Sequence, residues 1–220
     1  MRKVRMTALA LCVVLMLSVS AWGDVAVNAT NFPDEVFREY VSSNFDTDSD
    51  DVLSDSEIAS VTSIDVNKMG ITTLEGVEYF TALTNLSCNA DNIVSLDVSQ
   101  NTALQTLYCQ GSRNETTFTY NGKLASLNVS GCTELYSLEC YYNQLTELDV
   151  SNNTALTRLD CYSNQLTELD LSNNTALTYL SCWGNQLTAL DVSNNTALKT
   201  LDCGSNQLTE LDVSTNTALT

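Results

Sequence analysis

The sequence predicts a right-handed solenoid made mainly of parallel β-structure, with two short strands in each coil and a small helical cap at its N-terminal end. The first observation is a 21-residue repeat, seen in five leucines that follow at that interval: Leu135, Leu156, Leu177, Leu198 and Leu219. The second is a set of cysteines at one position of the repeat: Cys88, Cys109, Cys140, Cys161, Cys182 and Cys203. A residue type held at one phase of a solenoid stacks on its copies, so we expect a cysteine ladder.

Each repeat contains two strand-like units in succession. In residues 156–174 the first unit follows LxxLxCxxNxL and the second follows LxxLDLxxN. We expect the leucines and Cys161 to point inward and the residues between them to point outward. One coil leaves its top and bottom uncovered, so several coils must stack to bury a core.

Asparagines recur where each strand ends and the backbone turns. Their side-chain amides can bond backbone groups that the turn leaves without partners. One expected ladder consists of Asn143, Asn164, Asn185 and Asn206. The other consists of Asn101, Asn153, Asn174, Asn195 and Asn216, with Cys132 substituting in that row.

This spacing is the leucine-rich-repeat pattern. The nested form, with Cys in the first unit and Leu-Asp-Leu or Leu-Asp-Val in the second, resembles the IRREKO class of bacterial leucine-rich repeats over roughly residues 83–220. The resemblance implies a leucine-rich-repeat solenoid, which we place at residues 61–220. The register breaks once, at an insertion of residues 111–122, which is either a short protruding hairpin or a plain surface loop.

Residues 1–23 predict a secretory signal peptide. Three basic residues are followed by an apolar run and by Ala21-Trp22-Gly23, a small-x-small cleavage site. A membrane anchor is the alternative, but the run is short for a bilayer span. We therefore expect a secreted or cell-surface protein without a membrane span in the mature chain.

The charge balance restricts the partners. The chain has 27 acidic and 9 basic residues, a net charge of −18, and no histidine. Nucleic acid and anionic membranes are disfavoured, whereas cationic ligands and metal ions are favoured. The lack of histidine rules out His-based catalytic triads and His metal sites.

Residues 24–60 are expected to form the helical cap. A helix is predicted over residues 31–45, with Asn31 as its N-cap, Pro33 in its first turn and an apolar stripe that starts at Phe32. The stripe should pack on the open end of the solenoid.

Residues 46–57 resemble an EF-hand calcium loop. The six ligand positions are occupied by Asp46, Asp48, Asp50, Val52 through its carbonyl, Ser54 and Glu57. The loop departs from the pattern at its sixth position, where Asp51 replaces the usual glycine. The resemblance implies calcium as a ligand, and the alternative is a solvated acidic turn.

Two further segments complete the expected organisation. Residues 61–80 follow a related rhythm with the variant Leu-Glu-Gly-Val-Glu-Tyr-Phe at 74–80, which resembles the initial repeat of internalins. At the other end no polar capping segment precedes Thr220. An uncovered coil invites association, so we expect the sequence to be truncated there.

The cysteines allow three interpretations: buried packing residues, disulfides or metal ligands. They are equivalent and inward-facing, and their spacing is not that of a C-x-x-C metal site. We favour packing thiols, which behave as small hydrophobes.

The two outward faces of the coils differ. Face two repeats Glu-x-Asp-x-Ser and is either a cation-binding strip or a solubilising surface with local Asp hydrogen bonds. Face one varies more and is the expected ligand-binding surface. Its candidate residues are Tyr108, Tyr141, Arg158, Asp160, Tyr162, Tyr179 and Trp183. Stacking that merely covers the sheet is the alternative for these aromatics.

These features predict an exported, non-enzymatic binding or adhesion protein whose repeat surface recognises a protein, glycan or cationic ligand. The alternative is a structural spacer or stalk that presents a missing C-terminal domain.

Overall fold

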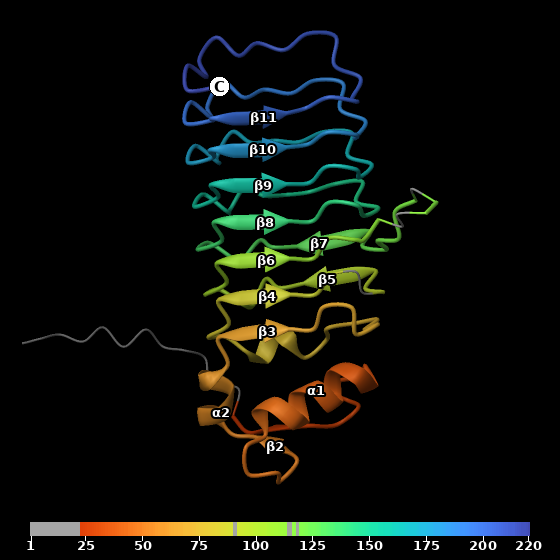
Figure 1. Ribbon diagram of the computed structural model, residues 1–220. Helices are drawn as coiled ribbons and strands as arrows, with labels where there is room; N and C mark the ends of the chain where they lie inside the picture. Colours follow the sequence, from red (N-terminus) through yellow and green to blue (C-terminus); the bar gives the residue numbers. More distant parts are fainter. Residues whose placement is uncertain (1–22, 90–91, 114–115, 118) are drawn as a thin grey trace, which may run out of the picture.

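The computed structural model describes residues 23–89, 92–113, 116–117 and 119–220. It shows a tall stack of coils standing on a small helical base (Figure 1). The predicted signal peptide lies outside the described residues, apart from Gly23. Among the residues that are described, no helix is long and apolar enough to cross a membrane.

The base holds two helices and two short strands. These are β1 (Val25–Ala26), α1 (Glu35–Phe45), β2 (Val52–Leu53) and α2 (Asp55–Ser60). β1 and β2 pair antiparallel. The fully buried Phe32 makes ring contacts with Phe37 of α1 and with Phe80, at centroid distances of 5.9 and 6.3 Å. These aromatic contacts close the lower end of the solenoid.

The first helix starts later than the sequence predicted. Asp34, not Asn31, is the N-cap of α1, and its carboxylate accepts from Phe37 N at 3.0 Å. Pro33 accounts for the shift, because a proline disfavours helical backbone at the residue before it. Asn31 instead donates its side-chain amide to Ala26 O at 2.8 Å.

The first halves of the coils build one parallel sheet in the order β11-β10-β9-β8-β6-β4-β3. Its strands are β3 (Ser63–Asp65), β4 (Asn85–Ser87), β6 (Thr106–Tyr108), β8 (Ser137–Glu139), β9 (Arg158–Asp160), β10 (Tyr179–Ser181) and β11 (Thr200–Asp202). A single 3-10 turn, η1 (Val77–Tyr79), lies in the first coil. The central leucines align across the sheet, as Leu159 does with Leu180, so equivalent residues form columns.

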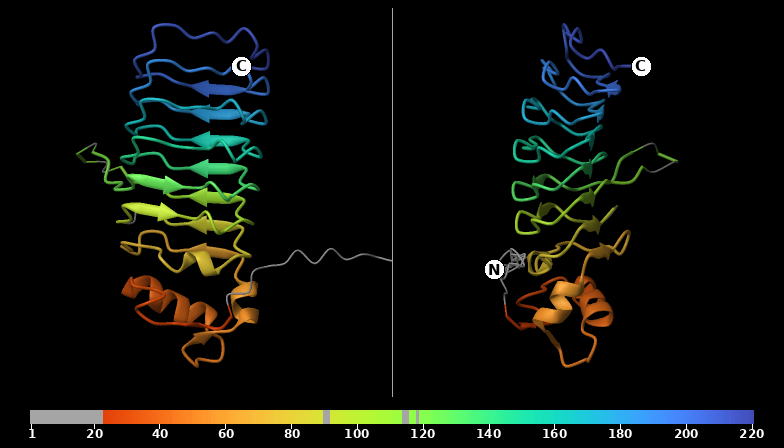
Figure 2. Two further views of the ribbon diagram at one scale, coloured as in Figure 1. Left: turned by 180° about the vertical axis from the view of Figure 1, so that it is seen from behind. Right: turned by 90° about the vertical axis from the view of Figure 1, so that its left-hand side faces the viewer.

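The expectation of two strands in every coil is corrected. A second strand forms in two coils of the described chain, as the parallel pair β5 (Ser95–Asp97) and β7 (Ser126–Asn128). In later coils the second half is extended but carries no ladder. There the Leu145 amide donates to the Asn164 side chain at 3.0 Å instead of to a neighbouring strand. Figure 2 shows these second halves running behind the main sheet.

The core consists of the repeated apolar residues. Leu156, Leu159, Cys161 and Leu166 are fully buried. Cys109, Cys140, Cys161 and Cys182 are buried free thiols, and Cys203 is a partly buried one. Burial raises the pKa of the Cys161 thiol well above its usual range, and the neighbouring Cys140 and Cys182 add to the shift. The ladder therefore holds protonated thiols that pack as hydrophobes.

Both asparagine ladders bond the turns. Asn164 donates to Cys140 O and Cys161 O at 3.1 and 3.0 Å, which ties two coils together. In the second ladder Asn174 donates to Val150 O and Asn153 O at 3.0 and 2.9 Å. Cys132, which replaces asparagine in that row, places its Sγ 3.1 Å from Val98 O.

Candidate calcium loop and recognition surface

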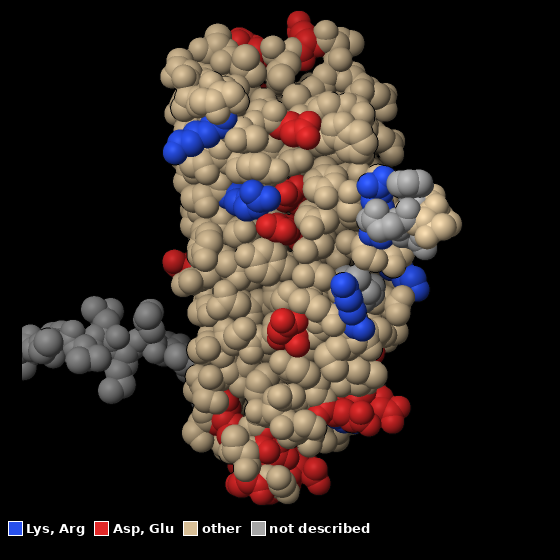
Figure 3. All heavy atoms as spheres, viewed as in Figure 1, with Lys and Arg blue, Asp and Glu red and all other residues tan. Residues whose placement is uncertain are grey.

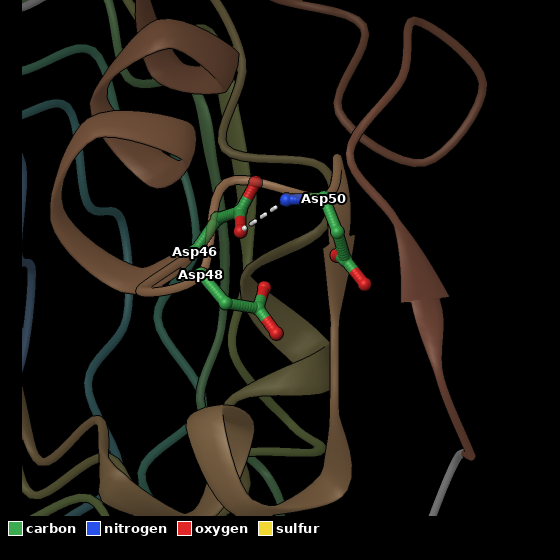
Figure 4. Close-up of side chains that lie close together, drawn as sticks. All are labelled: Asp46, Asp48 and Asp50. Carbon is green, nitrogen blue, oxygen red and sulfur yellow. Dashed lines mark hydrogen bonds between the residues drawn. The ribbon is translucent and has the colours of Figure 1, made fainter.

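The acidic loop between α1 and α2 gathers three carboxylates. Asp46, Asp48 and Asp50 each offer an oxygen within 4.8 Å of the others. Figure 4 shows the three side chains around one turn. The Asp46 carboxylate also orders this turn, because it accepts from Asp50 N at 3.2 Å and from Asp51 N at 3.0 Å.

The turn is tight at the position where the sequence departs from the EF-hand pattern. Asp51 has a φ of 63° and Ser49 a φ of 59°, both in the left-handed region. Glycine adopts this backbone without cost, whereas Asp tolerates it better than most other residues. The loop thus makes the sharp turn although it lacks the glycine.

Glu57, the last expected ligand, is not part of this group of three carboxylates and bonds the loop backbone instead. Its Oε1 accepts from Thr47 N and Thr47 Oγ1, both at 2.6 Å, and its Oε2 accepts from Ser54 N at 2.9 Å. These hydrogen bonds, led by that of the Thr47 hydroxyl, lower the pKa of Glu57 to about 2. Ser54 is at the same time the N-cap of α2, so Glu57 and Ser54 form a capping box.

The donor set still suits a hard cation. Three aspartate carboxylates supply the oxygen ligands that calcium prefers. The pKa of Asp48 is raised, first by the negative charge of Asp50 and then by burial, Glu57 and Asp46. Val52 lies in β2 and donates its amide to Asp50 Oδ1 at 2.9 Å. The loop therefore holds negative charge that a cation would neutralise.

A polar cluster occupies the middle of the seven-stranded sheet and consists of Glu139, Arg158, Asp160 and Tyr179. Arg158 Nε lies 3.1 Å from Glu139 Oε1, and Arg158 Nη2 lies 2.8 Å from Asp160 Oδ2. The guanidinium carbon sits 3.9 Å above the centre of the Tyr179 ring. This cluster is one of the few charged spots on a largely uncharged sheet face, whereas acidic residues gather over the base (Figure 3).

Asp160 is the most perturbed group of the polar cluster. It is only 4% exposed, and within the described part of the chain its Oδ1 has no partner in hydrogen-bonding geometry. Burial raises the pKa of Asp160 to about 6, and Arg158 offsets only part of this effect. The cluster thus contains a buried acceptor with unused capacity.

An aromatic ridge runs beside the polar cluster and consists of Tyr120, Tyr141, Tyr142, Tyr162 and Trp183. The rings of Tyr141 and Tyr162 are stacked, with centroids 4.4 Å apart and planes 10° from parallel. Among the described residues, Tyr162 makes ring contacts with Tyr141 and Tyr142 and none with Trp183. The indole ring of Trp183 instead lies against Gly204 in the next coil. The contact is so close that a Cβ atom at position 204 would lie 2.9 Å from Trp183 Cδ1. Trp183 is 39% exposed.

Two members of the aromatic ridge were missed from the sequence. Tyr142 should point inward by strand alternation, but its φ of 58° turns the chain and brings its ring edge-on to Tyr162 at 4.8 Å. Tyr120, in the insertion, stacks on Tyr142 at 4.1 Å. Ser163 and Gly184 occupy the equivalent position in later coils, also with positive φ. These small residues at the same position of the repeat were the sequence signal that Tyr142 lies in a turn.

The insertion itself contains a short antiparallel contact. Arg113 bridges to Tyr120, and Asn121 N donates to Ser112 O at 3.0 Å. Its described residues therefore favour the hairpin over a plain loop. Tyr108, the remaining candidate, lies on β6 in register with Glu139. The predicted ligand-binding residues thus divide into the ridge, the polar cluster and Tyr108.

Comparisons with known proteins agree with this architecture. The family model for leucine-rich repeats (two copies) matches residues 175–216. Two Internalin J sequences from different strains of Listeria monocytogenes are 43% and 44% identical over 71 residues. The crystal structure of internalin C2 from the same organism is 21% identical, with a TM-score of 0.68, and the match covers 90% of this chain and 86% of that one. This chain therefore carries leucine-rich repeats that are similar to those of internalins.

The similarity to internalins concerns the repeat region. The matched segment spans 32% of this chain and only 8% of each Internalin J sequence. The functional domain of InlJ from Listeria monocytogenes, which includes a cysteine ladder, is 33% identical, covering 92% of this chain and 57% of that one, with a TM-score of 0.45. The internalin-like solenoid supports a role in protein interaction in general.

Proposed function

We propose that the chain is an exported, non-enzymatic binding protein that recognises a protein or glycan through the aromatic ridge and the polar cluster. The stack of Tyr141 on Tyr162 carries the proposal. It places two flat rings side by side just beyond the ends of β8 and β9. The predicted signal peptide and the similarity to internalins support export to the cell surface or beyond it.

The chemistry of the two groups is complementary. Tyrosine and tryptophan offer large contact areas at little cost in conformational entropy, because each has two side-chain torsions. Their ring faces suit the flat side of another ring or of a sugar. Beside them, Arg158 is oriented by two carboxylates, and Asp160 retains an acceptor without a partner among the described residues. A ligand could thus gain apolar contact from the ridge and polar contacts from the cluster.

Screening on glycan and extracellular-matrix protein arrays tests this proposal. The wild-type chain should give hits that are lost when Tyr141, Tyr162 and Trp183 are all changed to Ser. A control changes the exposed Tyr136 to Ser, because this residue belongs neither to the ridge nor to the polar cluster. Thermal unfolding of each variant shows whether the solenoid has remained folded.

The outcomes separate binding from a spacer role. Hits lost in the ridge variant and retained in the control support recognition by the ridge. Hits that survive the triple change would show that the ridge only covers the sheet. No hit at all with the folded wild-type chain would favour the structural spacer.

We further propose that the acidic loop binds calcium through Asp46, Asp48 and Asp50, with Ser54, Glu57 and the Val52 carbonyl completing the set. The convergence of three carboxylates supports this. Glu57 would have to exchange its hydrogen bonds to Thr47 for the ion. Calorimetric titration of the chain with calcium chloride, compared with the Asp48→Asn variant, tests the proposal, and equal heats in both proteins would reject it.

A further inference from the structure

A groove lies on the second halves of the coils, away from the seven-stranded sheet. Its volume is about 720 Å³, and its lining extends along the chain from Leu127 to Asn194. This size falls within the range of about 300–1,000 Å³ typical of ligand sites. The groove begins at Leu127 of β7 and continues over later coils, whose described second halves carry no strand. It shares no residue with the aromatic ridge or the polar cluster.

The groove is rimmed by negative charge. Its lining contains five carboxylates, Glu147, Asp149, Glu168, Asp170 and Asp191, and contains no lysine or arginine. Equivalent residues of neighbouring coils stand roughly 4.8 Å apart, so adjacent carboxylates repel one another. A cationic partner would relieve this repulsion.

The aspartate side chains of the rim are held by hydrogen bonds from the backbone that follows them. Asp149, Asp170 and Asp191 each accept the backbone amide of the serine two residues on, at 2.9, 2.8 and 2.8 Å. Hydrogen bonds to these serines lower the pKa of all three. The aspartates therefore stay ionised side by side. Glu147 and Glu168 are exposed, so their carboxylates can reach an incoming ligand.

The floor of the groove is apolar. Leu148 and Leu169 line it and are 7% and 8% exposed, whereas Leu159 on the main sheet is fully buried. In the next coil Ala189 takes the place of the glutamate and lies in the lining. A methyl group here leaves more room above the floor than a glutamate would.

The column of aspartates is interrupted in the coil where the groove begins. There Asn128 stands in the aspartate column and donates its amide to Asp97 Oδ2 at 3.0 Å. The unrelieved carboxylates begin above this pair, at Glu147 and Asp149. The aspartate column is therefore interrupted at the lower end of the groove.

We propose that this groove binds an extended, lysine- or arginine-bearing segment of a partner protein. The aliphatic stems of such side chains lie along Leu148 and Leu169, and their charged ends meet Glu147 and Glu168. Long basic side chains bury their stems on apolar surface while their heads stay at polar groups. A bare metal ion would use the carboxylates and leave the leucine floor unused.

Fluorescence anisotropy with a labelled peptide of alternating lysine and serine tests the proposal on the whole chain. Binding should weaken as salt is raised, because the contacts are exposed to solvent. The double change Glu147→Gln and Glu168→Gln should weaken it about tenfold, since each exposed ion pair contributes modestly. The matched control, Glu39→Gln with Glu134→Gln, removes the same charge outside the groove and should change affinity less than about twofold.

A second peptide tests the leucine floor. Replacing each lysine by diaminobutyric acid, with binding measured at pH 6, keeps the positive charge and shortens the stem, so affinity should fall several-fold. Equal affinity for the two peptides, equal losses in the groove variant and its control, or no loss in the groove variant would each overturn the proposal. Calcium binding that depends on Glu147 and Glu168, without peptide binding, would also overturn it.

Discussion

Arg158 Nη2 approaches Asp160 Oδ2 to 2.8 Å, yet the pKa of Asp160 is raised to about 6. An arginine this close normally lowers the pKa of a carboxyl group. Here burial is the larger effect, because Asp160 is only 4% exposed and, within the described chain, its Oδ1 lacks a hydrogen-bond partner. Desolvation of the carboxylate therefore outweighs attraction to the guanidinium.

This balance predicts a pH dependence of stability. Because the folded pKa lies above the unfolded value of 3.8, the Asp160 contribution favours the folded state below about pH 4 and is lost as the pH rises to about 6. A shift of about two pKa units corresponds to about 3 kcal/mol. In urea unfolding from pH 4 to pH 7, the stability of Asp160→Asn relative to wild type should rise with pH by an amount of this order. A constant difference across the range would contradict the assignment.

Calcium should raise the melting temperature of the chain. A ligand that binds only the folded state adds about 2.7 kcal/mol at a hundredfold excess over its dissociation constant, which corresponds to about 5–10 °C for a chain of this size. Asp48→Asn should abolish the rise, since Asp48 is exposed and its loss disturbs the loop little. Glu57→Gln should also abolish it, but at the cost of the Thr47 and Ser54 hydrogen bonds. Differential scanning calorimetry with calcium, and with magnesium for comparison, measures both effects.

Trp183 should be a major contributor to ligand binding. It is 39% exposed and lies over Gly204, so its truncation removes contact area without opening the core. Single aromatic anchors commonly cost at least about 2 kcal/mol when truncated, a loss of about thirtyfold in affinity. Trp183→Ala should show this loss in surface plasmon resonance against an array hit, with an unchanged melting temperature. Undiminished affinity would exclude Trp183 from the binding surface.

The asparagine ladder should contribute strongly to stability. Asn174→Ala removes two buried hydrogen bonds and leaves Val150 O and Asn153 O without these partners. Both carbonyls still accept a backbone amide, from Asn153 N and Leu156 N. We therefore expect the loss of two hydrogen bonds at about 1 kcal/mol each, about 2 kcal/mol in all. The neighbouring Asn173 is exposed and makes one bond, to Ser151 O at 3.1 Å. Asn173→Ala should therefore cost less than about 1 kcal/mol, and similar losses in the two variants by chemical denaturation would refute the ladder's role.

The sequence by itself determined the solenoid, its period and the residues that fill its core. In a stack of equivalent coils each position lies on its own copies, so a 21-residue pattern fixes which leucines, cysteines and asparagines are buried together. For that reason the ladders of Cys161 and Asn174 could be predicted from spacing alone. The three aspartates of the acidic loop also followed from local spacing.

Only the tertiary structure decided the features that depend on unlike neighbours. Tyr142 joins the aromatic ridge through a left-handed turn, Trp183 turns onto Gly204, and Asp160 becomes desolvated beside Arg158. The groove above Leu148 and Leu169 likewise depends on how the second halves of neighbouring coils lie against one another. The repeat pattern fixes the coil in which each side chain lies and whether it points inward or outward. Contacts across the coils depend instead on side-chain rotamers and local backbone torsions, which a repeat pattern does not encode.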